Sequence, residues 1–487
     1  MMSFELNSES LIAGRSGFDT PGSAIFDPPV QSAQPSSGIT QNLSLLRSDS
    51  SSTTNAADDS SWKSNSYIVI SGGTGGNAIC TAFGGDTCYA LPVSDDGGSS
   101  SEIIRVLGGP SIGDIRSRLV RLIPASPVGS PLDRIRNLLA YRLKTDSSER
   151  EAREEWRDIV EGSSVLWSGI PADRKEVIRG FLVNFESEVL KRAQKNFSFR
   201  NGSIGNYFIA AAQSFFRSLP SAIFLFSSIT SSKANIQPVI VTNHTVTIAV
   251  ELENGKNIVG QCNISHPVRS GAGTMFSVPS SPALGIESLL VPSQNFMFDK
   301  ASQHSSKPEP LESKIRRLFY INAYGVEIKP FPNLDFLRNL ASRDTLVYSC
   351  GSLWTSIIPC LALRGVGSAI ACSMTLKAKV VLLNSQNDRE TAGYTAIDYV
   401  NAITRSLNDH GESSGQKQSF PSSAFITHLV HLKGGTVTVD EHQLSEMGIQ
   451  CLQVERSLNK SNKNDDYHVP LFDADTVSHA LRIVRDS

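Results

Sequence analysis

Short apolar runs alternate with helical patterns along most of the chain from residue 66 onwards. The run Tyr67–Ile70 predicts a buried strand, Ala78–Phe83 predicts a helix, and Thr87–Val93 predicts a second strand. The alternation returns late in the chain and closes with a helical pattern at Ala474–Val484. Further strands are expected at Arg317–Ile321, Thr345–Ser349, Lys379–Leu383, Phe425–Leu429 and Cys451–Val454.

Residues 144–235 carry only helical periodicity and interrupt this alternation. Asp173–Gln194 has the pattern of a long amphipathic helix, and Ile204–Phe216 that of a more apolar, buried one. After this block, two β-rich runs flank Asn254–Gly255, which is the strongest short-range signal for a hairpin. The pattern as a whole predicts an α/β fold, with one doubly wound, mostly parallel sheet, a helical insertion and a β-hairpin.

Composition marks two segments outside this pattern. Residues 1–65 are rich in Ser, Thr, Asn, Pro and Gly and hold few large apolar groups, which predicts a disordered tail. Residues 267–310 have a similar bias and no sustained period, so we expect a flexible loop insertion there. The remainder, residues 66–487, is expected to form one domain.

Charge, cysteine content and apolar runs exclude several classes of protein. A net charge of -2 and 7% aromatic residues give little reason to bind nucleic acid. No apolar run reaches about 18 residues, so no membrane span is expected. Seven cysteines without a CxxC motif, and no basic-apolar leader, favour a cytoplasmic protein with reduced thiols. The oligomeric state stays open, with a homo-oligomer as one option.

A glycine-rich turn after the first strand is the clearest local signal. The segment Gly73–Ala78 fits G-x-G-x-x-G/A, follows a strand and opens a helix, where backbone N–H groups can approach a phosphate. The alternative is a glycine-rich turn without a ligand. The candidate phosphate-binding residues are Gly72, Gly73, Thr74, Gly75, Gly76 and Asn77.

Two acids, Asp95 and Asp96, end the second strand, and a flexible Gly-Gly-Ser-Ser loop follows them. A ribose clamp needs one carboxylate, so the pair suits a metal ion or a phosphorylated ligand better. Asp114 stands near the start of a later helix, and with Asp96 it could hold a Mg²⁺ ion that bridges a diphosphate. The alternatives are a helix N-cap for Asp114 and an ordinary turn residue for Asp96.

Arg105 and Arg116 flank Asp114 and could neutralise phosphate oxygens, or could be solvated surface charges. A second strand–glycine–helix junction lies at Gly351–Ser352 and predicts another anion-binding turn at the same sheet edge. Cys350 beside it is a candidate low-pKa thiol, or a small buried residue. Tyr394 lies in a loop leaving that edge, where it could stack on a base or be a half-buried loop aromatic.

The motifs occur in an order that resembles the family of the 2-phospho-L-lactate transferase CofD and the gluconeogenesis factor YvcK. The resemblance runs from Ser66 to the C-terminus without the insertions, and the DDGGSS and GSLWTSIIP stretches are closer to the YvcK branch. The motifs are SGGTGG, SDDGGSSSEI, GGPSIGDIRSRL, NGSIGNYFIAAA, ELENGKNIVGQCNIS, CGSLWTSIIPCLAL and ETAGYTAIDYV.

The resemblance implies a Rossmann-like core and a set of site residues. Asp96 and Asp114 match the acids expected at a Mg²⁺ ion, and Gly72–Asn77 match the phosphate loop. The other matches are Gly351, Ser352 and Thr355 in the second loop, Asn206 at the start of the buried helix, and Tyr394 on the nucleotide side. The chain departs from YvcK-like sequences at Ser349–Ser352 and Leu383–Arg389.

Two functions remain open at this point. In the first, the protein is a Mg²⁺-dependent transferase of the 2-phospho-L-lactate transferase type, acting on a nucleoside-diphosphate-linked small molecule. In the second, the same cleft binds a UDP-sugar, no bond breaks, and the protein regulates central carbon metabolism. No residue stands out as a catalytic base.

Overall fold

The structure is a computed structural model that describes residues 66–72, 75–266, 309–409, 419–456 and 469–487. The expected tail and almost all of the expected loop insertion lie outside these residues. The described residues belong to one compact unit, Lys63–Ser487.

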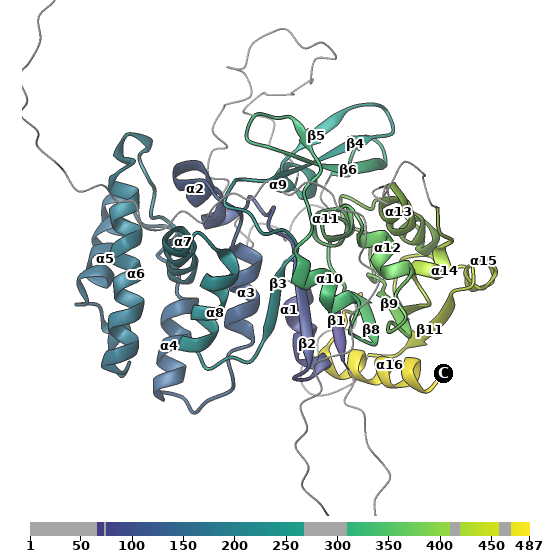
Figure 1. Cartoon of the computed structure of the whole chain (residues 1–487), viewed down its shortest axis with the longest axis horizontal. Helices are drawn as coiled ribbons and strands as arrows, with labels where there is room; N and C mark the ends of the chain where they lie inside the picture. Colours follow the sequence, from purple (N-terminus) through teal and green to yellow (C-terminus); the bar gives the residue numbers. More distant parts are fainter. Residues whose placement is uncertain (1–65, 73–74, 267–308, 410–418, 457–468) are drawn as a thin grey trace, which may run out of the picture. The chain divides into compact units, whose positions relative to one another are not determined.

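Seven parallel strands form the central sheet, in the order β11-β10-β9-β8-β1-β2-β3 (Figure 1). In β1, Tyr67 pairs with Thr87 of β2 on one side and with Thr345 of β8 on the other. The chain therefore winds outward from β1 in both directions, which confirms the doubly wound α/β prediction. The strands are β1 (Tyr67–Ile70), β2 (Thr87–Leu91), β3 (Asn235–Pro238), β8 (Thr345–Tyr348), β9 (Ala378–Leu382), β10 (His428–Leu432) and β11 (Gln450–Val454).

The predicted hairpin belongs to a second, antiparallel sheet of four strands, ordered β5-β4-β6-β7. Gly255 adopts a φ of 83° in the turn between β4 and β5, as the Asn-Gly pair predicts. The prediction that the run at Arg317–Ile321 joins the parallel alternation is wrong, because this strand, β6, pairs antiparallel with β4. Its exposed Arg316 marks a sheet with one solvated face. The strands are β4 (Thr247–Leu252), β5 (Asn257–Val259), β6 (Ile315–Ile321) and β7 (Glu327–Ile328).

The late strand expected at Phe425–Leu429 begins three residues further on, as β10. A short helix, α14 (Ser422–Phe425), precedes it and buries the Phe425 ring in the core. The apolar run thus belongs to two elements, and periodicity over so short a window does not separate them.

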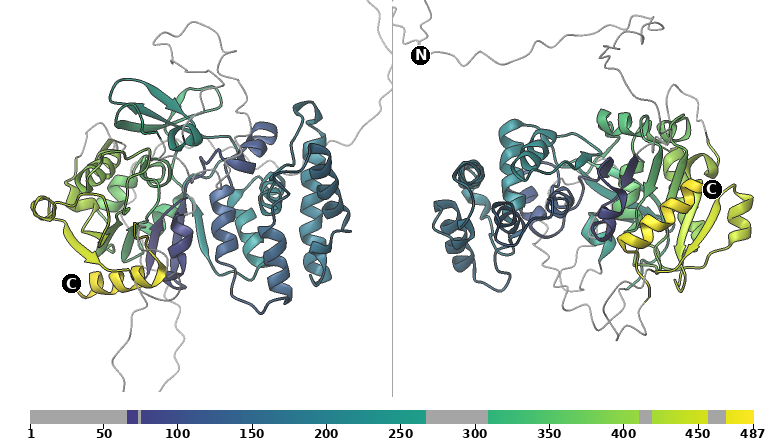
Figure 2. Two further views of the ribbon diagram at one scale, coloured as in Figure 1. Left: turned by 180° about the vertical axis from the view of Figure 1, so that it is seen from behind. Right: turned by 90° about the horizontal axis from the view of Figure 1, so that it is seen from below.

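Five helices form a block beside the sheet (Figures 1 and 2). Three of them, α4, α7 and α8, pack against α3, and α8 also packs against the edge strand β3. Inside the block, the Trp156 ring stacks on Phe199 at 5.2 Å, and Phe185 stacks on Tyr207 at 4.4 Å. The helices are α4 (Pro131–Ala140), α5 (Glu149–Glu161), α6 (Ala172–Leu190), α7 (Ile204–Phe216) and α8 (Leu219–Ile229).

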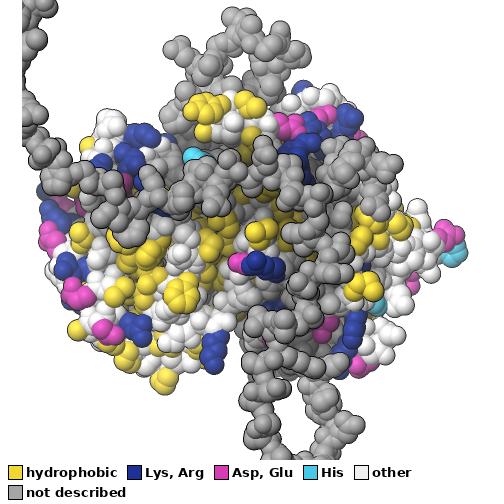
Figure 3. Space-filling view, in the orientation of Figure 1, with side chains coloured by type: hydrophobic (Ala, Val, Ile, Leu, Met, Phe, Trp, Pro, Cys, Tyr) yellow, Lys and Arg dark blue, Asp and Glu magenta, His cyan; other side chains and the backbone are white. Residues whose placement is uncertain are grey.

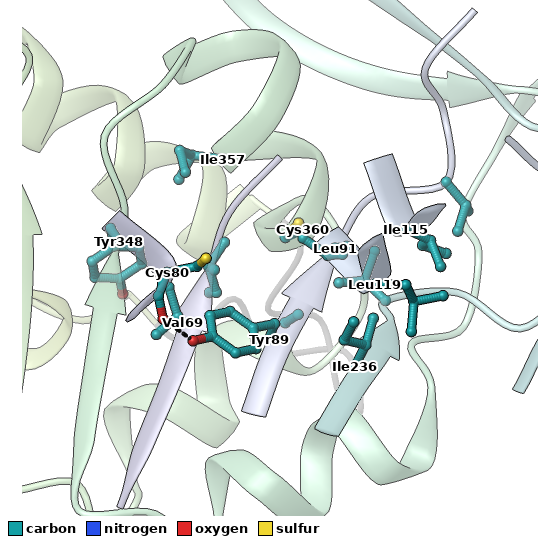
Figure 4. Close-up of a cluster of buried hydrophobic side chains, with 14 of the residues drawn as sticks. Val69, Cys80, Tyr89, Leu91, Ile115, Leu119, Ile236, Tyr348, Ile357 and Cys360 are labelled. Carbon is teal, nitrogen blue, oxygen red and sulfur yellow. Dashed lines mark hydrogen bonds between the residues drawn. The ribbon is translucent and has the colours of Figure 1, made fainter. Parts of the chain in front are cut away.

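The remaining helices cover the sheet or follow its strands. Figure 4 shows the strand residues Val69, Tyr89 and Leu91 in one buried cluster with Ile115 and Leu119 of α3. These helices are α1 (Gly75–Ile79), α2 (Gly98–Leu107), α3 (Gly113–Arg121), α9 (Gln261–Ser265), α10 (Leu334–Leu340), α11 (Ile358–Leu361), α12 (Val366–Ala371), α13 (Ala396–Asp409), α15 (Glu441–Glu446) and α16 (Ala474–Asp486).

Hydrophobic side chains gather over the helical block on the face drawn in Figure 3. On the helical block, Phe215 of α7 is 65% exposed and Phe224 of α8 is 73% exposed. None of the described helices combines the length and the apolar character that crossing a membrane requires.

Candidate functional site

The two glycine-rich turns meet at the carboxyl edge of neighbouring strands β1 and β8. A Cβ atom built on Gly75 would lie 3.3 Å from the carbonyl oxygen of Cys350 and 3.3 Å from the Cα of Gly351. The close approach of the two backbones explains why the first turn has glycine here. Gly73 and Thr74 lie outside the described residues. The site lies where the winding of the sheet changes direction.

A buried arginine, Arg118 of α3, lies beneath the first turn. Its Nε donates to the Asn77 side chain at 2.8 Å, and its Nη2 donates to the Ser71 hydroxyl at 2.7 Å. The guanidinium stacks over the Tyr89 ring, is 1% exposed, and leaves Nη1 without a hydrogen-bond partner. A Cβ on Gly76 would lie 2.7 Å from Nη2. Burial lowers the pKa of Arg118 from its ordinary value.

The sequence analysis missed Arg118, although its position carries a signal. It lies three residues after Ile115 and directly before Leu119, so it shares the buried face of α3. A charged residue in a core position is rare unless it has a partner or a function.

Asp95, rather than Asp96, lies beside Asp114. A Cβ on Gly113 would lie 2.7 Å from Oδ2 of Asp95, and one on Gly72 would lie 3.1 Å from Oδ2 of Asp114. Burial, and next the negative charge of Asp114, raise the pKa of Asp95 well above its ordinary value. The two carboxylates therefore repel each other next to the first turn.

Asp96 turns away from this pair toward α9. Its Oδ1 accepts a hydrogen bond of 2.8 Å from the backbone N–H of Cys262. A Cβ on Gly260, which has a φ of 91°, would lie 2.6 Å from Oδ2 of Asp96. Burial raises the pKa of Asp96, and the bond from Cys262 opposes that shift. Among the described residues, no three His, Cys, Asp or Glu side chains stand close enough to hold a metal ion by themselves.

Arg116 and Asn206 form a buried connection behind the acids. Arg116 Nε donates to Oδ1 of Asn206 at 3.0 Å, and Asn206 Nδ2 donates to the Ser99 hydroxyl at 2.9 Å. Burial lowers the pKa of Arg116 to about 10. These contacts join α3, α7 and α2. Gly205 is needed because a Cβ there would lie 2.4 Å from the backbone carbonyl oxygen of Leu139 and 3.0 Å from the Arg116 side chain.

Arg105 lies apart from this group. Its guanidinium pairs with Glu102 at 2.7 Å and donates to the backbone carbonyls of Lys195 and Asn196. It therefore ties α2 to the helical block.

The second turn is closed by side chains from the loop after β9. The backbone N–H groups of Trp354 and Thr355 both donate to Oε2 of Glu390 at 3.1 Å, and the Thr355 hydroxyl donates to Oε1. Burial is the main cause that raises the pKa of Glu390 to about 8. The helix that follows this turn starts as a π-helix at Leu353–Ile357. The hydrogen-bond acceptor at this helix start is thus the protein's own carboxyl group.

Asn384 and Asp388 complete the closure. The N–H of Gly351 donates to Oδ1 of Asn384 at 3.1 Å, and Asn384 Nδ2 donates to the Gly351 carbonyl at 2.7 Å. The Ser352 hydroxyl donates to Asp388 at 3.2 Å. These contacts use the groups that the sequence analysis assigned to a phosphate.

Tyr394 is buried and Cys350 is half-buried in the structure. Tyr394 is 5% exposed, and its hydroxyl oxygen accepts a hydrogen bond from Trp354 Nε1 at 3.2 Å. Lys314 Nζ lies 5.0 Å from the centre of its ring. Stacking on a base stays a prediction. For Cys350 the expected low pKa is wrong, because burial raises the pKa of its thiol to about 11.

Comparisons with known proteins agree with these features of the fold. A family model described as 2-phospho-L-lactate transferase CofD matches residues 67–456. The chain is 35% identical over 436 residues to "Uncharacterized protein YNL011C" of Saccharomyces cerevisiae, covering 80% of this chain and 95% of that one.

More distant relatives include a "Gluconeogenesis factor" of Halalkalibacterium halodurans, 22% identical, with 80% of this chain and 88% of that one covered. The crystal structure of protein BH3568 from Bacillus halodurans matches with a TM-score of 0.53 and 19% identity, over 86% of this chain and 100% of that one. The match of the family model over most of the chain, together with the yeast relative, means that the chain belongs to the CofD family.

Proposed function

We propose that this protein is a Mg²⁺-dependent transferase of phosphorus-containing groups that acts on a nucleoside-diphosphate-linked small molecule. The observation that carries this proposal is the meeting of the Gly75 and Gly351 turns, beside Asp95 and Asp114, at the switch point of a parallel sheet. In open α/β sheets ligands bind at this position.

The environment of the first turn suits an anion. Arg118 carries a positive charge directly beneath Gly76, in a buried position where solvent screens it little. Its Nη1 has no hydrogen-bond partner. A diphosphate above the turn would compensate that charge.

The acid pair fits a hard divalent cation. Asp95 and Asp114 offer carboxylate oxygens and repel each other. Mg²⁺ is usually held by one or two protein carboxylates together with substrate phosphates, so a set of three protein ligands is not required. Bound by Asp95 and Asp114, it would offset the charge of the diphosphate oxygens.

In the proposed reaction, an acceptor hydroxyl forms a bond to the distal phosphorus. The bond from that phosphorus to the nucleoside monophosphate breaks, and the hydroxyl proton passes to solvent. Because the leaving group needs only charge stabilisation, the protein's contribution is positioning and electrostatics. Arg118 and the glycine turn would hold the diphosphate, and Asn206 with Arg116 would keep α2 and α3 in place.

A non-catalytic regulator that binds a UDP-sugar is the second candidate. The name of the Halalkalibacterium halodurans relative, gluconeogenesis factor, favours it. Such a protein would use the same crevice and the same Asp95–Asp114 pair, but no bond would break.

Turnover separates the two candidates. The full chain is incubated with Mg²⁺ and nucleoside-diphosphate-linked substrates, including the guanosine diphosphate adduct of 2-phospholactate with a deazaflavin acceptor. Mass spectrometry then follows the released nucleoside monophosphate. The transferase proposal expects release that Asp114→Asn lowers by at least about tenfold, whereas Asp146→Asn, an exposed acid, leaves it unchanged.

Binding of UDP-sugars without any released monophosphate would support the regulator instead. If Asp114→Asn binds nucleotides as tightly as the unaltered chain, with and without Mg²⁺, the metal role of the acid pair is wrong.

A further inference from the structure

A cavity of about 230 Å³ opens at the carboxyl ends of β9 and β10, next to the second turn. Asn384 lines it, and the same side chain is hydrogen-bonded to Gly351 in both directions. Strands in a sheet lie about 4.8 Å apart, so the β9–β10 ends are roughly 10 Å from the crevice between β1 and β8. One wall residue thus joins the cavity to the proposed diphosphate position.

Two buried polar groups line this cavity without a hydrogen-bond partner. The Ser385 hydroxyl belongs to a residue that is 6% exposed, and the Nε2 atom of His431 belongs to one that is 8% exposed. Glu441 Oε1 is the nearest charged atom to Nε2, at 3.8 Å, which is too long for a hydrogen bond. Burying such groups without partners costs free energy, and native proteins seldom do so without a reason.

The lining indicates what would satisfy these groups. The lining residues include no Lys or Arg, so the cavity is unsuited to a phosphate. The amides of Asn384 and Gln453 line it as well, and Leu383 and Val437 supply apolar surface. Burial lowers the pKa of His431, so its ring is neutral at pH 7. A flat, uncharged ring with N–H and carbonyl groups on its edge fits this mixture.

We propose that this cavity binds the nucleobase of the nucleotide ligand, with Ser385 and His431 as its hydrogen-bonding contacts. The inference rests on the proposed function, since it assumes a diphosphate in the crevice between β1 and β8. It adds a second subsite, and Ser385 lies in the Leu383–Arg389 loop, where the chain departs from YvcK-like sequences.

Affinity and stability should respond in opposite ways when these groups are removed. Ser385→Ala and His431→Leu each delete a polar atom that has no partner in the free protein, so the melting temperature should stay the same or rise. Each variant should lower the affinity for the most tightly binding nucleoside diphosphate by about three- to tenfold. Ser126→Ala is the matched control, because its hydroxyl is also buried and unpartnered but lies outside the cavity.

The measurement is isothermal titration calorimetry of the full chain with GDP, UDP, ADP, CDP, ribose 5-phosphate and pyrophosphate. Losses confined to the nucleoside diphosphates support the proposal. Equal losses for ribose 5-phosphate would assign the cavity to a sugar and overturn it, as would unchanged nucleotide affinity in both variants. If the unaltered chain binds no nucleotide at all, the proposed function itself fails, and the nucleobase site fails with it.

Discussion

Two turns of the same local design lie side by side at the sheet edge, and the fold treats them differently. Each follows a parallel strand, contains glycine and opens a helix. At the first turn, a buried cation, Arg118, lies beneath the backbone. At the second, a buried carboxylate, Glu390, accepts the helix N–H groups of Trp354 and Thr355.

The difference comes from residues far away in the sequence. Arg118 arrives from α3, about forty residues after the first turn, and Glu390 from the loop after β9. A helix start attracts negative charge wherever it occurs. When the chain itself supplies a carboxyl group, the N–H groups of the turn are already hydrogen-bonded and the turn has a structural role. When it supplies a cation instead, the turn keeps a net attraction for an external anion.

The largest effect should come from filling the space under the first turn. A Cβ on Gly76 would lie 2.1 Å from the Ser71 hydroxyl oxygen and 2.7 Å from Arg118 Nη2. Gly76→Ala should therefore lower the free energy of unfolding by about 2–3 kcal/mol, because it displaces the buried guanidinium. Urea denaturation followed by circular dichroism measures this change.

Gly85→Ala is the matched control for that substitution. Nothing lies within 4 Å of a Cβ at Gly85, and its φ is not positive. The control should change stability by less than about 0.5 kcal/mol. A Gly76→Ala protein as stable as the control would mean that Arg118 does not support the first turn.

The closure of the second turn by Glu390 should make the stability of the protein depend on pH. The pKa of Glu390 is about 8 in the fold against an ordinary value of 4.5. A raised folded pKa gives stability that is complete below pH 4.5 and is lost as the pH rises toward 8. Glu390→Gln keeps an acceptor for the two N–H groups and carries no charge, and its amide N–H would donate to the Thr355 hydroxyl, which donates to Glu390 in the unaltered chain.

The Glu390→Gln variant should accordingly match the unaltered chain near pH 4 and become progressively more stable than it as the pH rises to 8.5. Unfolding free energies at both pH values test this. Equal pH profiles for the two proteins would show that Glu390 is ionised without penalty and does not close the turn as a buried, neutral acid.

Removing one acid of the pair beside the first turn should also stabilise the protein at neutral pH, but by a smaller amount of unfolding free energy. The pKa of Asp95 is raised above 3.8, so its ionised form destabilises the free protein, and stability falls as the pH rises from about 4. Asp95→Asn should stabilise the metal-free chain by about 1 kcal/mol at pH 7 and leave it unchanged near pH 3.5. Thermal unfolding in EDTA measures the gain, and 5 mM Mg²⁺ should stabilise only the unaltered chain.

The fold could be predicted where periodicity and local turn chemistry decide it. The parallel strands around Tyr67–Ile70 and the Asn254–Gly255 hairpin follow from patterns within a few residues. The antiparallel place of β6 did not follow, because which sheet a strand joins depends on distant partners. An apolar run alone carries no information about that choice.

The site was predicted less completely, for the same reason. Asp114 and the glycine turns were found by residue type and spacing. The sequence analysis chose Asp96, whereas Asp95 lies beside Asp114. Residue type alone does not decide between the two acids, because successive residues point to opposite sides in extended chain. The hydrogen bonds from the second turn to Glu390 could not be predicted either, since no residue near Thr355 in the sequence indicates them.

Of the two arginines predicted to contact phosphate, Arg105 should have the smallest effect on nucleotide affinity when it is replaced. Arg116 is 8% exposed and bound to Asn206 behind the acid pair, whereas Arg105 is tied to Glu102 and to backbone carbonyls of the helical block. Arg105→Ala should therefore change nucleotide affinity by less than about twofold and stability by about 0.5 kcal/mol. Calorimetric titration with the tightest nucleoside diphosphate measures the affinity. A tenfold loss would mean that Arg105 leaves Glu102 to meet the ligand, and that the end of α2 belongs to the anion site together with the first turn.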